Sequence, residues 1–372
     1  MRVLITGANG FIGKNLLVHL RERQIEAVLF TREMPRQELA VALLGVDFVF
    51  HLAGVNRPKN ISEFVDGNAA LTEQLCNLIR ASGRQIPVLY TSSIQAEASN
   101  PYGTSKRAAE EALVALQKDN GSPTYLYRLP NVFGKWSRPN YNSAVATFCH
   151  NIANDLPIQI NDPSASVCLV YIDDVIKDFL RLLNDQPPGV HWPEITPAYK
   201  ITVGELANQI KLFRTSRESM VSEAVGTGLT RALYSTYLSF LRPGQFSYMV
   251  PVHADARGRF VEMMKTKDSG QFSFFTAHPG ITRGEHYHHS KNEKFLVIQG
   301  KAKFGFRHVV SDETYELFVD GDKPEIVETV PGWSHNITNI GSTEMIVMLW
   351  ANEIFDRQHP DTIAYKVSLV SG

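Results

Sequence analysis

The sequence predicts two domains of different class: an α/β domain with a doubly wound parallel sheet over residues 1–242, and an all-β domain over residues 243–372. The first observation is length, because 372 residues exceed what a single hydrophobic core normally serves. The second is an alternation of apolar strand-like runs with helix-like segments, which is typical of a parallel sheet covered by helices. The third is a change after Pro243 and Gly244 to short β-rich runs separated by turns, which is typical of a barrel or sandwich.

The alternation in the first domain can be followed element by element. Residues 46–52 (VDFVFHL) form a continuous apolar run, as expected for a strand that is buried on both faces of a parallel sheet. Further β-branched runs alternate with segments whose apolar residues recur at helical spacing. The other predicted strands are residues 2–6, 27–30, 88–92 and 124–129. The predicted helices are residues 11–23, residues 68–79, and a helix that opens at Tyr102 and continues over residues 108–116.

The second domain is distinguished by its strands and by its histidines. The strands predicted from short apolar runs between turns are residues 260–265, 271–276, 294–299, 302–307, 314–319, 325–330 and 345–351. Eight of the twelve histidines lie beyond residue 250. We therefore expect a second site whose chemistry differs from that of the first domain.

The composition excludes several classes of function. A formal net charge of −1 provides no field that would attract nucleic acid or an anionic membrane surface. No apolar stretch approaches the ~20 residues that a spanning helix needs, and the short apolar run at the N-terminus ends in a glycine turn, unlike a signal peptide. The cysteines Cys76, Cys149 and Cys168 have no metal-binding or redox spacing. We expect a cytoplasmic protein with reduced thiols that neither binds nucleic acid nor inserts into membranes.

A glycine-rich turn lies between the first predicted strand and the first predicted helix. Its glycines have the spacing GxxGxxG. At such a turn the backbone approaches a pyrophosphate closely, and the helix N-terminus supplies positive potential. The candidate cofactor-binding residues of the turn are Gly7, Asn9, Gly10, Phe11, Ile12 and Gly13.

The end of the second predicted strand bears on the choice of cofactor. It carries Arg32 followed by Glu33. An acidic residue at this place hydrogen-bonds the ribose 2′-hydroxyl of NAD, whereas an arginine can pair with the 2′-phosphate of NADP. Arg32 favours NADP(H), and Glu33 leaves NAD as the alternative.

Tyr102 and Lys106 form a candidate proton-donating pair. Their i,i+4 spacing places the phenol and the ammonium group on one face of a helix. A nearby cation is expected to lower the pKa of the phenol, which lets it protonate a developing alkoxide. Ser93, at the end of the preceding strand, offers a hydroxyl to hold a substrate carbonyl. The same spacing recurs at Tyr287 and Lys291, so the spacing alone is weak.

With these motifs, residues 1–242 resemble the extended short-chain dehydrogenase/reductase family, whose members have a Rossmann-like fold and act largely on nucleotide sugars. The further motifs that carry the resemblance are VDFVFHLAG (46–54), RLPNVFG (128–134) and YIDDV (171–175). The resemblance implies that Tyr102 is the proton donor, that Lys106 assists it and binds the nicotinamide ribose, and that Ser93 holds the carbonyl. It also implies that Asn68 supports the site. The residues it adds to the cofactor site are Leu52, Ala53 and Gly54.

Departures from relatives in this family narrow the expected reaction. Sugar 4,6-dehydratases carry an Asp-Glu pair directly after the hydroxyl residue, whereas Ser93 is followed by Ile94 and Gln95. Dehydration is therefore not expected. Epimerases of the family retain NAD for a closed redox cycle, which Arg32 disfavours. The sequence favours a net reduction.

A second candidate site lies in the histidine-rich segment. The candidate ligands have side chains of the types that bind metals: His286, His288, Glu293 and His335. Alternate residues of a strand, such as 286 and 288, share a face. Three nitrogens and one oxygen suit Zn, Fe, Mn or Ni, and Zn is the ion we favour. A satisfied polar cluster without a metal is the alternative. His289 points to the opposite face and is interpreted as structural.

This segment resembles the cupin family, whose members are small double-sheet barrels. The spacing Gly280-x5-His286-x-His288-x4-Glu293-x6-Gly300 fits the first cupin motif, and residues 330–339 fit the second except that Val330 replaces a proline. Residues 282–286 also resemble the segment that carries the base in metal-free cupin-fold 3,5-epimerases, as residues 255–260 resemble their Asp-x-Arg-Gly turn. His286 is therefore a candidate metal ligand or a candidate catalytic base, and the ligand role is favoured.

The whole chain resembles bifunctional enzymes of capsular polysaccharide synthesis, in which such a reductase precedes a cupin. The motifs are LAGVNRP (52–58), PNVFGKW (130–136), PNYNS (139–143), LYSTYLS (233–239) and HHSKNEKFLV (288–297). The resemblance implies a UDP-linked 2-acetamido-2,6-dideoxy-4-ketohexose as substrate, C3 epimerisation by the cupin, and NADPH-dependent C4 reduction to UDP-2-acetamido-2,6-dideoxy-L-talose. It also implies a homodimer. The alternatives are a monofunctional reductase whose cupin is a metal-binding dimerisation module, and a non-enzymatic NADP(H)-binding sensor.

Overall fold

The computed structural model describes residues 1–250, 252–255, 258–261, 264–266, 270–353 and 358–368. The chain forms two compact units: unit 1 comprises Met1–Trp136 and Val167–Lys200, and unit 2 comprises Ser137–Ser166 and Ile201–Gly372. By packing, residues 137–166 and 201–242 belong to unit 2, whereas the sequence places them before the predicted domain boundary between residues 242 and 243. That boundary stays a prediction.

Unit 1 is built on one parallel sheet of Rossmann type, as predicted. Its described strands lie in the order β2-β1-β3-β4-β5-β8, and each neighbouring pair is parallel. The strands are β1 (Arg2–Thr6), β2 (Glu26–Phe30), β3 (Phe48–His51), β4 (Val88–Ser93), β5 (Thr124–Leu129) and β8 (Val190–His191). β1 and β5 have the predicted bounds. The reversal of strand order beside β1 is the place where open α/β sheets bind ligands.

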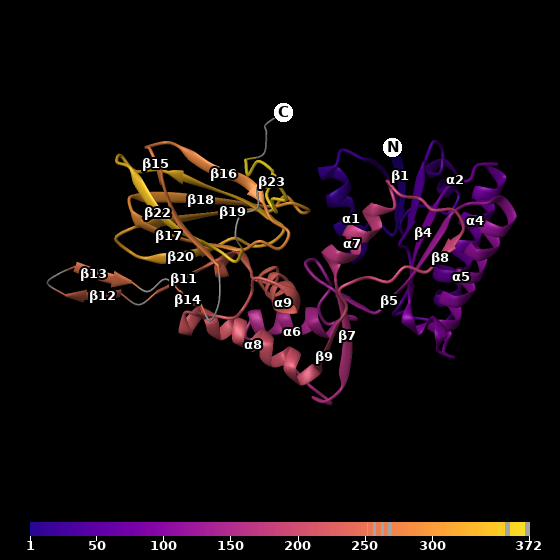
Figure 1. Ribbon diagram of the computed structural model, residues 1–372, viewed down its shortest axis with the longest axis horizontal. Coiled ribbons are helices and arrows are strands. Elements are labelled where there is room, and N and C mark those ends of the chain that lie inside the picture. Colours follow the sequence, from indigo (N-terminus) through magenta and orange to yellow (C-terminus); the bar gives the residue numbers. More distant parts are fainter. Residues whose placement is uncertain (251, 256–257, 262–263, 267–269, 354–357, 369–372) are drawn as a thin grey trace. The chain divides into compact units, whose positions relative to one another are not determined.

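Helices cover both faces of this sheet (Figure 1), which makes it doubly wound. The helical elements of unit 1 are α1 (Phe11–Glu22), α2 (Glu38–Ala42), α3 (Ser62–Phe64), the π-helical turn η1 (Val65–Ala70), α4 (Leu71–Ala81), the 3₁₀ turn η2 (Ile94–Glu97), α5 (Pro101–Asn120) and α7 (Ile172–Arg181). β6 (Asn131–Phe133) pairs in parallel with β7 (Ser166–Tyr171), and β9 (Tyr199–Thr202) crosses between the units. α4, α5 and the sheet enclose one core, in which Leu75, Val88 and Leu113 are fully buried.

The start of α5 matters most for function, and it agrees with the helix that Tyr102 was expected to open. The helix begins one residue earlier, at Pro101. The Asn100 side chain caps it by accepting a hydrogen bond of 2.8 Å from the Gly103 amide, and proline is favoured at the first helical position. Tyr102 and Lys106 therefore lie in the first two turns of α5.

Unit 2 combines helices with two five-stranded antiparallel sheets and, among its described strands, two smaller two-stranded sheets. Its helical elements are α6 (Ala144–Ala153), α8 (Val203–Ser219), α9 (Gly228–Leu238) and the 3₁₀ turn η3 (Pro243–Gln245). A buried charge cluster holds α8 to the strands: Arg217 Nη2 lies 3.4 Å from Glu328 Oε2, and Lys294 also pairs with Glu328. Because an unpaired buried charge is costly, these contacts give a physical reason why residues 201–242 pack with the C-terminal strands.

The β part of unit 2 has the predicted all-β architecture. The described strands form one sheet in the order β11-β20-β17-β22-β15 and another in the order β19-β18-β21-β16-β23, with antiparallel pairing in both. Phe295 in the first sheet and Phe304 in the second meet with ring centroids 5.6 Å apart, so the two sheets enclose a common core. This is the double-sheet form expected of a small barrel.

The bounds of these strands largely follow the predicted ones. The strands are β10 (Val221–Ser222), β11 (Ser247–Met249), β12 (Val252–Asp255), β13 (Gly258–Val261), β14 (Lys265–Thr266), β15 (Gln271–Ala277), β16 (Thr282–Tyr287), β17 (Glu293–Gln299), β18 (Lys301–His308), β19 (Thr314–Asp320), β20 (Glu325–Glu328), β21 (Trp333–Asn339), β22 (Met345–Ala351) and β23 (Ile363–Ala364). β10, β11, β12, β21 and β23 have no counterpart among the predicted strands, whereas β16 was expected only as a strand that carries residues 286 and 288. Residues 256 and 257 of the predicted Asp-x-Arg-Gly turn lie outside the described residues. None of the helices in the described part of the chain is long and apolar enough to cross a membrane.

Candidate functional sites

The glycine turn of unit 1 has the close packing that a dinucleotide site requires. Gly7 has a φ of +72°, and a Cβ there would lie 2.8 Å from the Ala53 backbone. A Cβ at Gly13 would lie 2.5 Å from the Gly7 carbonyl oxygen. Gly10 caps α1 without a side-chain hydrogen bond, and Phe11 and Ile12 begin the helix. These residues fit a pyrophosphate at the N-terminus of α1.

The loop after β3 completes the floor of this site. The Leu52 amide donates a hydrogen bond of 3.2 Å to the Thr6 carbonyl, which holds the loop beside β1. A Cβ at Gly54 would lie 3.0 Å from Lys106 Nζ and 3.1 Å from Asn68 Oδ1. The loop therefore passes directly against the candidate catalytic lysine.

The residues at the end of β2 do not decide between the two cofactors. The Arg32 side chain is 83% exposed and lies 3.5 Å from Glu63 Oε2. Asn9 Nδ2 donates a hydrogen bond of 3.5 Å to Glu33 Oε2, so Glu33 lies at the glycine turn. A hydrogen bond from Thr31 is the largest of the effects that lower the pKa of Glu33.

Ser93, Tyr102 and Lys106 come together at the end of β4 and the start of α5. Lys106 Nζ donates a hydrogen bond of 2.9 Å to the Thr91 carbonyl and lies 4.8 Å from the centre of the Tyr90 ring. Burial raises the pKa of Tyr102, and a side-chain hydrogen bond with Ser93 partly opposes that rise. The structure thus brings the three predicted residues to one place.

The predicted sign of the Tyr102 pKa shift was wrong. Lys106 was expected to lower the pKa of Tyr102. The pKa of Tyr102 is instead raised, because partial burial of the phenol disfavours its anion. Burial also lowers the pKa of Lys106 to about 8, and Glu110 opposes this. In the second Tyr-Lys copy, Tyr287 ends strand β16 and Lys291 Nζ pairs with Glu293 Oε1 at 2.7 Å, so that copy forms no helical pair.

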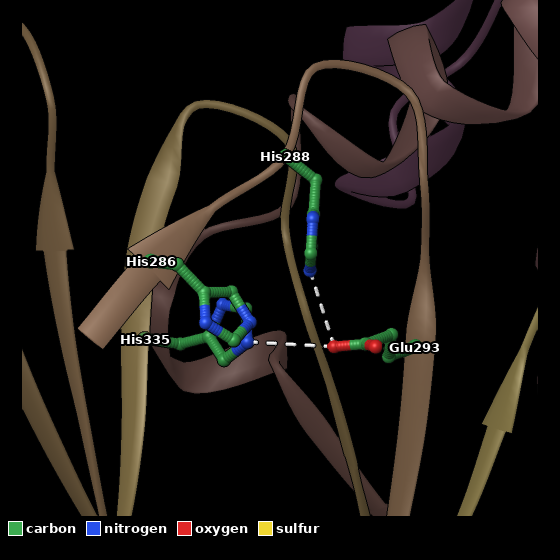
Figure 2. A group of neighbouring side chains, drawn as sticks. All are labelled: His286, His288, Glu293 and His335. Carbon is green, nitrogen blue, oxygen red and sulfur yellow. Dashed lines mark hydrogen bonds and ion pairs between the residues drawn. The ribbon is translucent and has the colours of Figure 1, made fainter. Parts of the chain in front are cut away.

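The four predicted metal-binding side chains also converge (Figure 2). One ligand atom from each of His286, His288, Glu293 and His335 lies within 4.8 Å of the others. Glu293 Oε2 lies 3.1 Å from His288 Nε2 and 3.5 Å from His335 Nε2, whereas no dashed contact joins it to His286. His286 is partly exposed and the other three are buried. His286 is therefore the member of the cluster most open to a substrate.

The local backbone explains how β16 presents His286 to this cluster. β16 pairs with β21 so that His286 faces His335, and the register shifts between Gly284 and His286. Gly284 has a φ of +104°, and Glu285 has a φ of +62°. Glu285 is held in this conformation by hydrogen bonds of 2.7 Å from Asn336 Nδ2 and 2.8 Å from the Val367 amide. Bulges of this kind re-aim side chains near active sites.

Burial and neighbouring charges set the ionisation of the cluster. Burial lowers the pKa of His286 to about 3, with His335 and His288 adding to the effect. Burial also lowers the pKa of His335. The pKa of Glu293 is well below its usual value although burial opposes this, because His288 and His335 hydrogen-bond to the carboxylate. Within the described residues, His335 Nδ1 is buried without a hydrogen-bond partner.

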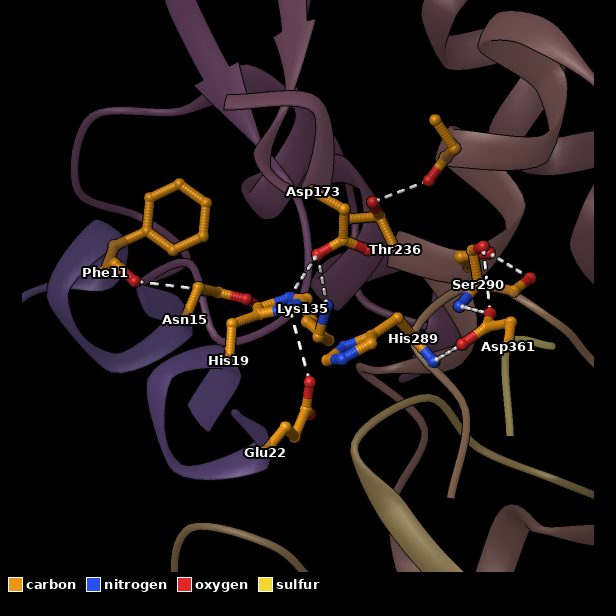
Figure 3. Close-up of polar contacts among 12 residues, drawn as sticks. Phe11, Asn15, His19, Glu22, Lys135, Asp173, Thr236, His289, Ser290 and Asp361 are labelled. Atoms are coloured by element: carbon orange, nitrogen blue, oxygen red, sulfur yellow. Dashed lines mark hydrogen bonds and ion pairs between the residues drawn. The ribbon is translucent and has the colours of Figure 1, made fainter. Parts of the chain in front are cut away.

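Asp361 was missed by the sequence analysis, although it shapes this site. His288 lies just beyond the end of β16 rather than within it, and its Nδ1 hydrogen-bonds the Asp361 carbonyl. The Asp361 carboxylate accepts hydrogen bonds of 2.8 Å from the His289 amide and 2.7 Å from the Ser290 amide (Figure 3). Asp361 is 71 or more residues from these partners in the sequence, and no motif marks it. His289 itself is buried, and its structural role stays a prediction.

Sequence comparisons place the chain in a known class. Residues 3–193 match the NAD dependent epimerase/dehydratase family, and residues 253–363 match the polysaccharide biosynthesis C-terminal domain. The chain is 62% identical over 368 residues to the UDP-2-acetamido-2,6-beta-L-arabino-hexul-4-ose reductase of Pseudomonas aeruginosa, covering 99% of each chain. It is 26% identical over 230 residues to the dTDP-4-dehydro-6-deoxyglucose reductase of Escherichia coli, covering 49% of this chain and 72% of that one.

A solved structure narrows the class further. The capsular polysaccharide assembling protein CapF of Staphylococcus aureus has 42% sequence identity and a TM-score of 0.68, with 99% of this chain and 100% of that chain covered. The chain therefore belongs to the NAD dependent epimerase/dehydratase family and, within it, to the CapF-like capsular polysaccharide enzymes, which join this domain to a C-terminal β domain.

Proposed function

We propose that the chain is a nicotinamide-dependent reductase of a UDP-linked 4-ketosugar used in polysaccharide synthesis. The observation that carries the proposal is the convergence of Ser93, Tyr102 and Lys106 beside the glycine turn. The 62% identity to a UDP-ketosugar reductase supports it, as does the weaker likeness to a 4-dehydro-6-deoxyglucose reductase. A sensor of redox state would not need a proton-donating relay at this position.

The reduction assigns one task to each of these residues. The cofactor supplies the hydride that forms the new C4–H bond. Ser93 donates a hydrogen bond to the C4 oxygen, and Tyr102 transfers its phenolic proton to that oxygen as negative charge develops there. Lys106, positively charged below about pH 8, stabilises the phenolate that remains. The sum is a ketone, a hydride and a proton converted to an alcohol.

We further propose that the β domain epimerises C3 of the same substrate before reduction. A C3–H bond next to a C4 ketone is acidic because its electron pair can delocalise into the carbonyl. A base in the histidine cluster takes this proton, and a proton returned to the opposite face restores the ketone with inverted C3. His286, the partly exposed member of the cluster, is a candidate for this base, although its role as a metal ligand is favoured. Reduction then gives UDP-2-acetamido-2,6-dideoxy-L-talose.

The same cluster fits a divalent metal, and we favour zinc. His288, Glu293 and His335 would hold the ion, with His286 as a fourth ligand if it is not the base. Support comes from the donor set of imidazole and carboxylate groups, of which one ligand atom from each lies within 4.8 Å of the others. The bound ion would supply Lewis acidity to stabilise enolate charge. The hydrogen bond from His288 to the Asp361 carbonyl fixes the orientation of that ring.

Solvent exchange tests the epimerase proposal on the intact chain. Incubation with the UDP-linked 4-ketosugar in D2O without NADPH should place deuterium at C3, because removal and return of the proton need no hydride. Mass spectrometry and proton NMR of the sugar would measure the exchange, with a no-enzyme sample as control. Absence of exchange, together with intact NADPH oxidation, would leave a monofunctional reductase.

The cofactor proposal is NADP(H), and Arg32 provides its test. Arg32→Ala should raise the KM for NADPH on the order of tenfold or more and leave the KM for NADH nearly unchanged, because only the former has a 2′-phosphate. Arg21→Ala, which removes an exposed charge from the last turn of α1, is the matched control. Equal use of both cofactors by the unmodified protein, with Glu33→Ala raising the KM for NADH, would assign NAD instead.

We retain two further proposals about the protein as a whole. One is a homodimer, supported by the exposed aromatic residues Phe272 and Phe274 on β15, which lies at the edge of its sheet. The other is a cytoplasmic location, supported by the nucleotide-linked substrate proposed above.

A further inference from the structure

A buried histidine in unit 1 lies next to the cofactor loop and has no part in the mechanism described so far. His51, the last residue of β3, is fully buried. Its Nδ1 lies 2.7 Å from Thr6 Oγ1, and its Nε2 lies 2.8 Å from Thr72 Oγ1. Both ring nitrogens are therefore satisfied by hydroxyl groups from other elements.

The hydrogen-bond partners determine which nitrogen carries the proton. Thr72 Oγ1 donates its proton to the Asn68 carbonyl at 2.7 Å, so its oxygen is left to accept from His51 Nε2–H. His51 Nδ1 is then the acceptor for the Thr6 hydroxyl, whose oxygen also accepts the Ala53 amide at 3.2 Å. With its proton on Nε2, the neutral His51 ring provides a hydrogen-bond partner for both threonine hydroxyl groups. Burial, reinforced by the charge of Lys106, lowers the pKa of His51 to about 3, which agrees with a neutral ring.

The row of hydrogen bonds continues from Asn68 to the catalytic helix. Asn68 Oδ1 accepts the Val55 amide at 2.8 Å, and its Nδ2 donates to the Val55 carbonyl at 3.0 Å. The same Nδ2 donates to Ser105 Oγ at 2.9 Å, and Ser105 Oγ donates to the Tyr102 carbonyl at 2.8 Å. These hydrogen bonds, linked through the main chain and the side chain of Asn68, join the end of β1 to the residue proposed as proton donor.

We propose that His51 is a positioning residue of the reductase, which fixes the cofactor loop at residues 53–55 relative to Asn68 and the first turn of α5. The inference rests on the proposed reductase function. Its physical basis is that the loop packs closely against the catalytic lysine, since a Cβ at Gly54 would lie 3.0 Å from Lys106 Nζ. A displacement of the loop would move the nicotinamide relative to Tyr102, and misplacement of about 1 Å can cost on the order of a hundredfold in rate.

Thr72 offers a matched pair of variants to test this. Thr72→Val keeps the shape but removes the hydroxyl that joins His51 to Asn68, whereas Thr72→Ser keeps the hydroxyl. The measurement is the single-turnover rate constant of NADPH oxidation with the UDP-linked 4-ketosugar. We expect this rate constant to fall roughly tenfold to a hundredfold in Thr72→Val and to stay within about threefold in Thr72→Ser. The dissociation constant of NADPH should change less than the rate constant.

This measurement separates positioning from a merely structural role. Partial unfolding lowers the amplitude of a single turnover and the melting temperature, but leaves the rate constant of the folded fraction unchanged. If both variants keep the rate constant, or lose it equally, the inference is overturned. Thr6→Val and Thr6→Ser repeat the comparison at the other ring nitrogen if Thr72→Val does not fold. Unmodified protein that does not oxidise NADPH with this substrate would instead remove the proposed function itself.

Discussion

Tyr102→Phe should reduce the rate of NADPH-dependent ketosugar reduction by roughly 10²- to 10⁴-fold, the range that a general acid contributes. The substitution removes one oxygen and leaves the half-buried ring in contact with Phe64, whose centroid lies 5.6 Å away. Folding and cofactor binding should therefore change little. Following NADPH absorbance with saturating ketosugar would measure the loss.

Tyr102→Phe should leave the proposed C3 epimerisation intact. C3 deuterium exchange in D2O should persist in Tyr102→Phe at close to the original rate, because the histidine cluster makes no use of the Tyr102 phenol. Tyr125→Phe, which removes a phenol that hydrogen-bonds the Pro187 carbonyl at 3.0 Å, is the matched control for loss of a hydroxyl from unit 1. Loss of both reduction and exchange in Tyr102→Phe alone would contradict two independent sites.

The first site was predictable because its signals are local in sequence. The run VDFVFHL became β3, and the glycine turn precedes α1 as expected. The pKa of Tyr102 was not predictable, because spacing shows that a cation is near but not how far burial removes the phenol from water. The role of His51 was also hidden, since its hydrogen-bond partners Thr6 and Thr72 come from β1 and α4. A polar residue within an apolar strand was the one signal available.

The second site shows a different limit. His286, His288, Glu293 and His335 were found by motif spacing, and residues 286 and 288 were expected on one strand, yet β21, which carries His335, was not predicted as a strand. β16 contains Gly284 and Glu285 at positive φ, so its backbone departs from the regular alternation that sequence patterns reveal. Hydrogen bonds to Glu285 from residues 336 and 367 support that conformation. Contacts so distant in sequence leave no periodic trace.

The second large effect is expected from a substitution in the histidine cluster, which comprises His286, His288, Glu293 and His335. His288→Gln should remove most of the bound divalent metal and lower C3 exchange by a factor on the order of a hundred or more, because a buried imidazole that contacts Glu293 at 3.1 Å is lost from the donor set. NADPH oxidation by the same variant should persist with a substrate already inverted at C3. Metal content per chain by atomic emission, measured beside exchange and oxidation, tests all three statements. His278→Gln makes the same change at a histidine whose side chain is 82% exposed, and should alter none of them.

His286→Gln then decides between the two roles of that residue. As a ligand, His286 would be needed for metal retention, so the variant should lose metal and exchange together, as His288→Gln does. As the base alone, it would leave the metal in place while exchange falls, because proton abstraction needs a free imidazole nitrogen. We expect the first result. Unmodified protein that contains no divalent metal, and whose exchange is insensitive to chelators, would contradict the metal proposal and leave His286 as the base of a metal-free epimerase.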